Sequence, residues 1–234
     1  MSKDTPYQID RDAIRANLNK YTRQAYAMLP ELDEPRILDI GCGSGVPTIE
    51  LARLSNGEII GLDIDKTELD KLAGKLESQR LTDRIRIVEC SIAKLDFPNG
   101  SFDIIWAEGS VSAIGFRKGL EEWRRFLKPN GFLVVHDDIR NIEKKLDQVS
   151  ICGYELLGRF ILSDEVWWNE YYAPLDRRIE ELRNQHVDDP NLLTLLEKEQ
   201  KEINVFKKNP RRYQSVFIVM RKGRRVRQQL RADA

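Results

Sequence analysis

The chain alternates between short apolar runs and longer segments whose apolar residues recur at helical spacing. The apolar runs read "RILDIG", "GEIIGLDI", "RIRIVEC", "FDIIWAEG", "FLVVHDD", "YELLGRFIL" and "YQSVFIVMRK", and each predicts a strand. Helical patterns lie between several of them, in "PTIELARLS", "DKTELDKLAGKLESQRL" and "KGLEEWRRFL". This alternation predicts an α/β fold with a mostly parallel sheet and helices on both faces.

Two more helical segments lie outside this alternation. Apolar residues at helical spacing over residues 10–29 predict a helix within the N-terminal segment 1–30. Residues 164–208, between the last two predicted strands, predict a helical insert. The insert begins with an aromatic cluster, Trp167, Trp168, Tyr171 and Tyr172. We expect one domain over residues 1–234, because this length suits a single α/β core.

Composition narrows the cellular setting. No apolar run approaches the length of a membrane span, and the polar start "MSKDTPYQIDRDAIR" is not expected to act as a secretory signal. The three cysteines, Cys42, Cys90 and Cys152, are far apart and odd in number, which fits neither a disulfide framework nor a metal site. We therefore expect a cytoplasmic protein without a metal.

Charge is balanced overall but not along the chain. From Lys201 to the C-terminus, eleven basic residues face two acidic ones. A solvated basic tail over residues 221–234 is the simpler explanation, and a contact with RNA stays open as the alternative.

The most informative stretch is "ILDIGCGSGVP", in which Gly41, Gly43 and Gly45 follow the first strand. A dinucleotide site would need a third glycine at the position of Val46, and a P-loop would need a different spacing and a lysine. A ligand without phosphates but with an ammonium group fits better, and we expect Asp39 to recognise that group through ordered water. S-adenosylmethionine has an ammonium group, a sulfonium, a ribose and an adenine.

At this point the sequence resembles the class I S-adenosylmethionine-dependent methyltransferases. The stretch "LDIGCGSG" resembles their first motif, "GLDID" their acidic second motif, and "RRFLKPNGFLVVHD" the turn into their fifth strand. The run "AEGSVSAIGFRKGLEEW" resembles the ubiquinone/menaquinone-biosynthesis branch of small-molecule methyltransferases. The resemblance implies a Rossmann-like seven-stranded sheet whose last strand is antiparallel.

The resemblance also implies a cofactor site. Asp63 would bind the ribose, and Ser91 would contact the adenine where much of the family has an aspartate; Glu108 would lie beside the methionine part. The full set implied for the cofactor is Tyr21, Asp39, Gly41, Cys42, Gly43, Asp63, Ile64, Ser91, Ile92 and Glu108.

Candidates for catalysis and substrate contact are fewer. Glu108 follows the fourth strand at the edge where open α/β sheets place their ligands, so we expect it to contact the cofactor or orient the substrate. His136 is a candidate general base, although a lone histidine at a strand end more often makes a structural hydrogen bond. We expect Tyr171 and Tyr172 to face the substrate from an insert that closes as a lid, and the N-terminal helix to close over the cofactor.

These observations predict in-line methyl transfer to a small molecule, whose identity the sequence does not give. Two alternatives remain open: an RNA methyltransferase that uses the basic C-terminal stretch, and a non-catalytic protein that binds S-adenosylmethionine. We expect no nucleic-acid partner and no membrane span, and a homodimer is one option for the assembly.

Overall fold

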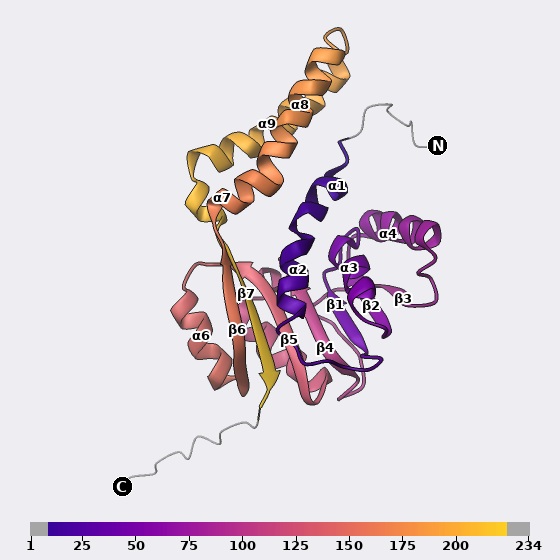
Figure 1. The fold of residues 1–234 in the computed structure, drawn as a ribbon, viewed down its shortest axis with the longest axis vertical. Coiled ribbons are helices and arrows are strands. Elements are labelled where there is room, and N and C mark those ends of the chain that lie inside the picture. Colours follow the sequence, from indigo (N-terminus) through magenta and orange to yellow (C-terminus); the bar gives the residue numbers. More distant parts are fainter. Residues whose placement is uncertain (1–8, 224–234) are drawn as a thin grey trace.

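The sheet contains seven strands in the order β3-β2-β1-β4-β5-β7-β6 (Figure 1). It is seen in a computed structural model that describes residues 9–223. The strands are β1 Ile37–Ile40, β2 Ile59–Asp63, β3 Ile85–Glu89, β4 Phe102–Glu108, β5 Leu127–Asp138, β6 Tyr154–Leu162 and β7 Ser215–Lys222. Strand β7 runs antiparallel to both β5 and β6, and the other pairings are parallel. The predicted Rossmann-like sheet with an antiparallel last strand is confirmed.

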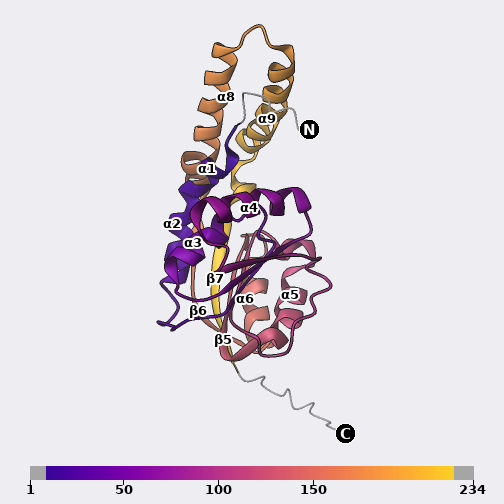
Figure 2. The ribbon, with the colours of Figure 1, turned by 90° about the vertical axis from the view of Figure 1, so that its right-hand side faces the viewer.

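Helices cover both faces of the sheet (Figure 2). Helices α2 (Asn19–Tyr26), α3 (Val46–Leu54) and α4 (Lys66–Gln79) pack their buried residues on one face. Helices α5 (Phe116–Trp123) and α6 (Ile142–Ile151) pack on the other. The apolar patterns anticipate all of these except α6.

The N-terminal segment forms two helices instead of the single predicted one. Helix α1 (Arg11–Arg15) is joined to α2 by a 3-10 turn, Ala16–Leu18. The side chain of Asp10 caps α1 by accepting a hydrogen bond from the Ala13 N–H. Helix α1 therefore begins within one residue of the start of the predicted helix at residue 10.

The segment predicted as a helical insert is helical. It contains α7 (Asp164–Trp167), a π-helical turn (Trp168–Tyr172), α8 (Ala173–Gln185) and α9 (Pro190–Lys208). Helices α8 and α9 form a hairpin that projects beyond the sheet (Figures 1 and 2) and has its own apolar cluster. The insert is therefore attached to the sheet mainly through its base, where α7 follows β6.

Neighbouring strands align four side chains in a row near the carboxyl ends of β4 and β5. Glu108 on β4 is the register partner of His136 on β5, His136 of Phe217 on β7, and Phe217 of Phe160 on β6. Register partners project to the same face of a sheet. This row lies under α2 and the base of the insert, next to the glycine loop.

Some predictions concern segments at the ends of the chain. Arg221 and Lys222 of the predicted basic tail belong to β7, whereas residues 224–234 lie outside the described residues, as do residues 1–8. Over the part of the chain that the structure describes, no helix is both long and apolar enough to cross a bilayer. The same residues contain no cluster of His, Cys, Asp and Glu that suits a metal ion.

Candidate functional site

The glycine loop leaves the sheet by means of three residues with positive φ. Gly41, Gly43 and Gly45 have φ values of 74°, 52° and 81°, a region that costs most L-residues about 1–2 kcal/mol. The N–H groups of Gly41 and Cys42 donate to the Leu62 carbonyl on β2, and Gly45 precedes the first turn of α3. The loop is thereby fixed between β1, β2 and α3.

Asp63, at the end of β2, holds this loop through its carboxylate. One oxygen accepts a hydrogen bond from the Gly43 N–H at 2.8 Å, and the other accepts from the N–H groups of Ile64 and Asp65 at 2.7 and 3.0 Å. Asp65 itself caps α4 by accepting from the Thr67 and Glu68 N–H groups. Two acids that are two positions apart therefore have separate tasks: Asp63 orders the loop and Asp65 begins the helix.

A pocket of about 450 Å³ opens at the carboxyl ends of β1, β2 and β4. Of the residues predicted to bind the cofactor, the pocket brings together Gly41, Asp63, Ile64, Ser91, Ile92 and Glu108. Its size lies within the range of about 300–1,000 Å³ that is usual for small-molecule sites. Its lining combines the polar side chains of Asp63, Ser91, Glu108 and Ser110 with apolar ones, which suits a ligand that has both polar and apolar parts.

Asp39 and Cys42 lie behind the loop and do not line the pocket. Asp39 is 2% exposed, and its carboxylate accepts a hydrogen bond of 2.6 Å from the Thr48 hydroxyl. Burial raises the pKa of Asp39 to about 7, and the hydrogen bond from Thr48 opposes that rise. The Asp39 carboxylate contacts Thr48 in the protein interior. Its expected contact with an ammonium group of the ligand stays a prediction.

Glu108 lines the pocket and is almost enclosed, with 3% of its side chain exposed. One oxygen accepts hydrogen bonds from the Thr22 hydroxyl at 2.8 Å and the Trp106 indole N–H at 2.9 Å. The other accepts from the Arg15 guanidinium at 2.8 Å. Because Arg15 and Thr22 belong to the N-terminal helices, Glu108 joins those helices to the centre of the site.

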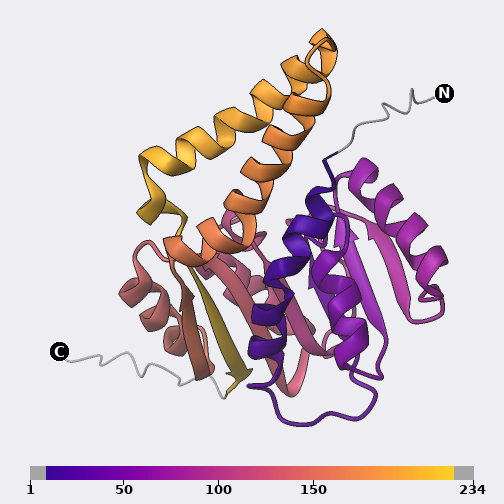
Figure 3. The same cartoon turned by 45° about the horizontal axis from the view of Figure 1, so that its top comes forward.

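Helix α1 lies between α4 and the helical insert (Figure 3), and its side chains make further contacts on both sides. The Asp12 carboxylate accepts from the Ser44 hydroxyl in the glycine loop at 2.6 Å and from the Lys75 ammonium on α4 at 2.5 Å. The Arg11 guanidinium donates to Tyr171 and forms ion pairs with Glu199 and Glu202 of the insert. Helix α1 thus contacts the glycine loop, the Glu108 carboxylate and the insert.

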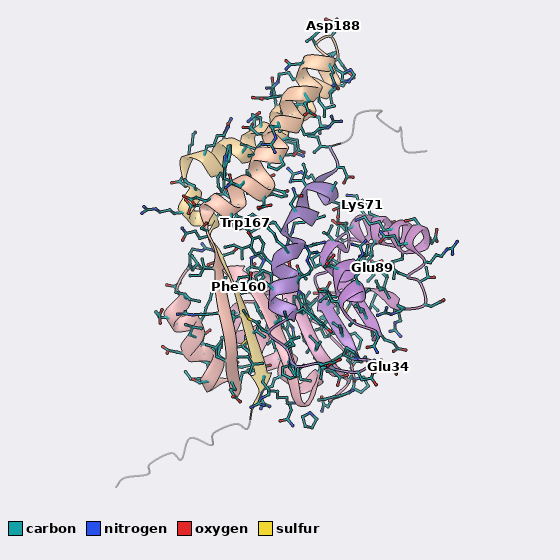
Figure 4. The ribbon with its side chains drawn as sticks, viewed as in Figure 1. Glu34, Lys71, Glu89, Phe160, Trp167 and Asp188 are labelled. Atoms are coloured by element: carbon teal, nitrogen blue, oxygen red, sulfur yellow. The ribbon has the colours of Figure 1, made fainter. Side chains whose placement is uncertain are left out.

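His136 is buried beside Glu108 in a stack of aromatic rings. Its ring lies 4.3 Å from the ring of Phe217 and 6.1 Å from that of Trp167, and both pairs are close to parallel. Its Nε2 atom lies 2.7 Å from the Ser215 hydroxyl, which also accepts a hydrogen bond from the Trp167 indole N–H at 3.0 Å. Burial lowers the pKa of His136 to about 4. Figure 4 shows Trp167 at the base of the insert, with Phe160 on the sheet beneath it.

The predicted tyrosines lie outside the pocket wall. Tyr21 packs against Phe160, with ring centroids 6.5 Å apart. The Tyr171 hydroxyl accepts from Arg11 at 3.0 Å. Tyr172 is 4% exposed and stacks on Phe206 within the insert. Contacts of these tyrosines with a cofactor or substrate stay predictions.

Some pocket residues are missed by the sequence patterns. They are Ala93, Gly109, Ser110, Ala113 and Ile114. Gly109 and Ser110 directly follow β4, so the rule that ligands bind at the carboxyl ends of strands, applied to every strand, would have found them. The Arg15–Glu108 pair has no comparable signal in the sequence, because its members are 93 positions apart.

The glycine loop provides a first test of these contacts. A Cβ at Gly41 would lie 2.4 Å from the Ser110 Cβ, whereas a Cβ at Gly43 would meet nothing within 4 Å. We expect Gly41→Ala to lower the free energy of unfolding by about 2–4 kcal/mol, through backbone strain and overpacking. Gly43→Ala, the matched control, should cost about 1–2 kcal/mol from backbone strain alone. Urea denaturation measures both, and equal losses would contradict the close approach of Gly41 to Ser110.

Comparison with known proteins gives a family for the central part of the chain. Residues 37–131 match the family described as "Methyltransferase domain". The sterol 24-C-methyltransferase ERG6B of Gibberella zeae is 32% identical over 103 residues, which cover 44% of this chain and 27% of that protein. The chain spans between about a quarter and a half of the length of the curated relatives it matches.

Solved structures share most of this fold. The [4+2]-cyclase SpnF has a TM-score of 0.70 at 20% identity, over 88% of this chain and 80% of that chain. A SAM-dependent methyltransferase from Geobacter sulfurreducens, solved with S-adenosyl-L-homocysteine, has a TM-score of 0.68 at 15% identity, over 92% of this chain and 98% of that chain. At these identities the likeness concerns the fold alone. The narrower ubiquinone/menaquinone branch stays a prediction.

Proposed function

We propose that this chain, a member of the class I S-adenosylmethionine-dependent methyltransferases through its residues 37–131, transfers a methyl group from S-adenosylmethionine to a small molecule. When bound, this cofactor supplies an electrophilic methyl group on a sulfonium. The leaving thioether is neutral, so the protein needs mainly to orient the two reactants and exclude water.

The residues of the pocket fit this cofactor. The absence of a Cβ at Gly43 leaves the loop backbone open to close approach by a ligand, whereas the absence of a Cβ at Gly41 makes room for Ser110. Asp63 provides a carboxylate for two ribose hydroxyls, and Ser91 provides a neutral hydroxyl for the adenine amino group. Ile64, Ile92 and Ile114 offer apolar surface to the adenine ring.

The Glu108 carboxylate defines the opposite side of the site. It carries a negative charge beside the place that the family resemblance gives to the methionine part and the sulfonium. Because Arg15, Thr22 and Trp106 hold it, its position is fixed before a ligand binds. We assign to Glu108 the orientation of the cofactor's cationic end and of the acceptor next to it.

The observation that carries the proposal is the hydrogen bond of 2.8 Å that the Gly43 N–H donates to the Asp63 carboxylate, which connects the glycine loop to the acidic residue of the pocket. Titration calorimetry with S-adenosylhomocysteine should give saturable binding. Incubation of the protein with labelled S-adenosylmethionine and a panel of small metabolites should transfer label to at least one of them. Absence of S-adenosylhomocysteine binding would refute the assigned site, and binding without transfer to any acceptor would favour a non-catalytic role.

An RNA methyltransferase is the weaker alternative. An RNA methyltransferase is favoured by the basic C-terminal stretch, but in its described part Lys207 is already paired with Asp176 and lies over the Trp168 ring. A gel shift with RNA at low salt, where electrostatic binding is strongest, tests this alternative. The fold is similar to that of the [4+2]-cyclase SpnF, so the fold alone does not determine the reaction.

The class of methyl acceptor, the cellular location and the oligomeric state are also proposals. We favour a small organic molecule, because the insert is aromatic and acidic where it meets α1, with Tyr171, Glu199 and Glu202. A cytoplasmic location and a homodimer remain predictions, and size-exclusion chromatography with light scattering would determine the latter.

A further inference from the structure

We propose that Trp167 and Ser215 hold His136 in the tautomer that carries its proton on Nδ1, so that neither ring nitrogen is available as a general base. The argument begins with the Trp167 indole, which can only donate. Its N–H points to the Ser215 oxygen at 3.0 Å. The Ser215 oxygen is therefore an acceptor in that bond, and its own hydrogen must point elsewhere.

The second step concerns that hydroxyl hydrogen. Ser215 is 5% exposed, and within the described residues the only other partner of its hydroxyl is the His136 Nε2 atom, at 2.7 Å. A buried hydroxyl hydrogen without an acceptor is costly, so it is donated to Nε2. An Nε2 atom that accepts has no proton, and in a neutral imidazole the proton is then on Nδ1.

The surroundings keep the imidazole neutral. Burial lowers its pKa, the Glu108 carboxylate on β4 raises it, and the Arg15 guanidinium on α1 lowers it. Glu108 and Arg15 have opposite charges and form an ion pair with each other, so their effects on the pKa of His136 oppose each other. Stacking between Phe217 and Trp167 fixes the plane of the ring, which keeps Nε2 directed at Ser215.

Trp167 gives this arrangement a link to the insert. It ends α7, and it packs against both the sheet's apolar cluster and the insert's own cluster. The packing of the insert on the sheet thus determines the position of the Trp167 indole N–H, and this N–H orients the Ser215 hydroxyl. Trp167 and Ser215 are positioning residues, because they act through His136.

A consequence for the acceptor follows, and it rests on the proposed function. Both oxygens of Glu108 already accept hydrogen bonds, and the His136 Nε2 lone pair is occupied by Ser215. His136 is therefore not available to remove a proton from the acceptor, and Glu108 keeps the orienting role assigned to it above. The acceptor class that suits this centre has a nucleophile that needs no base from it, such as an amine lone pair, a thiolate or an electron-rich carbon.

Nitrogen NMR of histidine tests the tautomer without any need for activity. The chain has two histidines, so a His186→Gln variant labelled with ¹⁵N-histidine shows His136 alone. We expect a long-range ¹H–¹⁵N spectrum with one protonated nitrogen, assigned to Nδ1 by its ring couplings, and no change between pH 5.5 and 8, which is the range in which an ordinary histidine titrates. A proton on Nε2, or protonation of the ring within that range, would overturn the proposal.

Two variants separate positioning from packing. Trp167→Phe keeps an aromatic ring but removes the indole donor, so the Ser215 hydroxyl is free to accept from Nε2–H. The loss of one ordinary hydrogen bond should raise the ratio of the Nε2–H to the Nδ1–H tautomer by about tenfold. Trp168→Phe is the control, because Trp168 stacks on Phe206 and has no bond to Ser215; its spectrum should match that of the parent. An unchanged tautomer ratio in Trp167→Phe contradicts the proposal, whereas a failure of S-adenosylhomocysteine binding or methyl transfer contradicts only the proposed function.

Discussion

Asp63→Ala is expected to weaken S-adenosylhomocysteine binding about 100-fold or more. The carboxylate fixes the glycine loop through the Gly43 N–H and is the group assigned to the ribose hydroxyls. Hydrogen bonds to a charged group are worth about 1.5–3 kcal/mol each, and about 2.7 kcal/mol corresponds to a factor of 100 in affinity. Titration calorimetry measures the loss directly.

Asp65→Ala is the matched control for that experiment. Asp65 lies two positions further along the same loop, but its carboxylate caps α4 by accepting from Thr67 and Glu68. We expect it to lower the free energy of unfolding by about 1 kcal/mol and to leave the affinity nearly unchanged. An equal loss of affinity in both variants would show that any acid near this loop has the same effect, and the assignment of Asp63 to the ribose would fail.

The parts of the fold that were predictable have strong local causes. The central strands are recognisable because they are buried on both faces, which makes them nearly continuous apolar runs. The glycine loop is recognisable because three positions need positive φ. Helix α6 was missed because Val149 is its only buried residue, so its apolar pattern is sparse.

The direction of a side chain is harder to predict than the element that carries it. Asp39 stands in β1, where all four residues are buried, so alternation gives no information on which face it occupies. The structure turns its carboxylate to Thr48 instead of the pocket. In the insert, the π-helical turn over Trp168–Tyr172 changes the helical phase. As a result, helical spacing does not indicate that Tyr172 is buried while Tyr171 meets Arg11.

Contacts between distant segments were not predictable at all. Arg15 is a basic residue in a charged stretch, and only the packing of the N-terminal helices on the sheet brings it to Glu108. The same holds for Asp12 and Ser44. The sequence therefore indicates the cofactor loop, whereas the covering of the site by α1 depends on tertiary packing.

Arg15→Ala is expected to lower the free energy of unfolding by about 3 kcal/mol. The substitution leaves the Glu108 carboxylate, with 3% of its side chain exposed, without its only charged partner among the described residues. Removal of one member of a buried ion pair typically costs about 3–5 kcal/mol, and we take the lower end because Arg15 is 24% exposed. Urea denaturation gives the value. Arg23→Ala is a suitable control, because buried Glu50 keeps its contacts with Arg53 and Asn19 when Arg23 is lost, and about 1 kcal/mol or less is expected.

The double variant Arg15→Ala/Glu108→Gln decides the physical cause. If the cost of Arg15→Ala arises from an uncompensated charge, then removal of that charge should recover stability, because a glutamine can still accept from Thr22 and Trp106. We expect the double variant to be more stable than Arg15→Ala alone by about 1–2 kcal/mol. If instead the two losses simply add, Arg15 acts by packing α1 on the sheet, and the carboxylate is stable without it. In that case the role assigned to Arg15 in fixing Glu108 would be wrong.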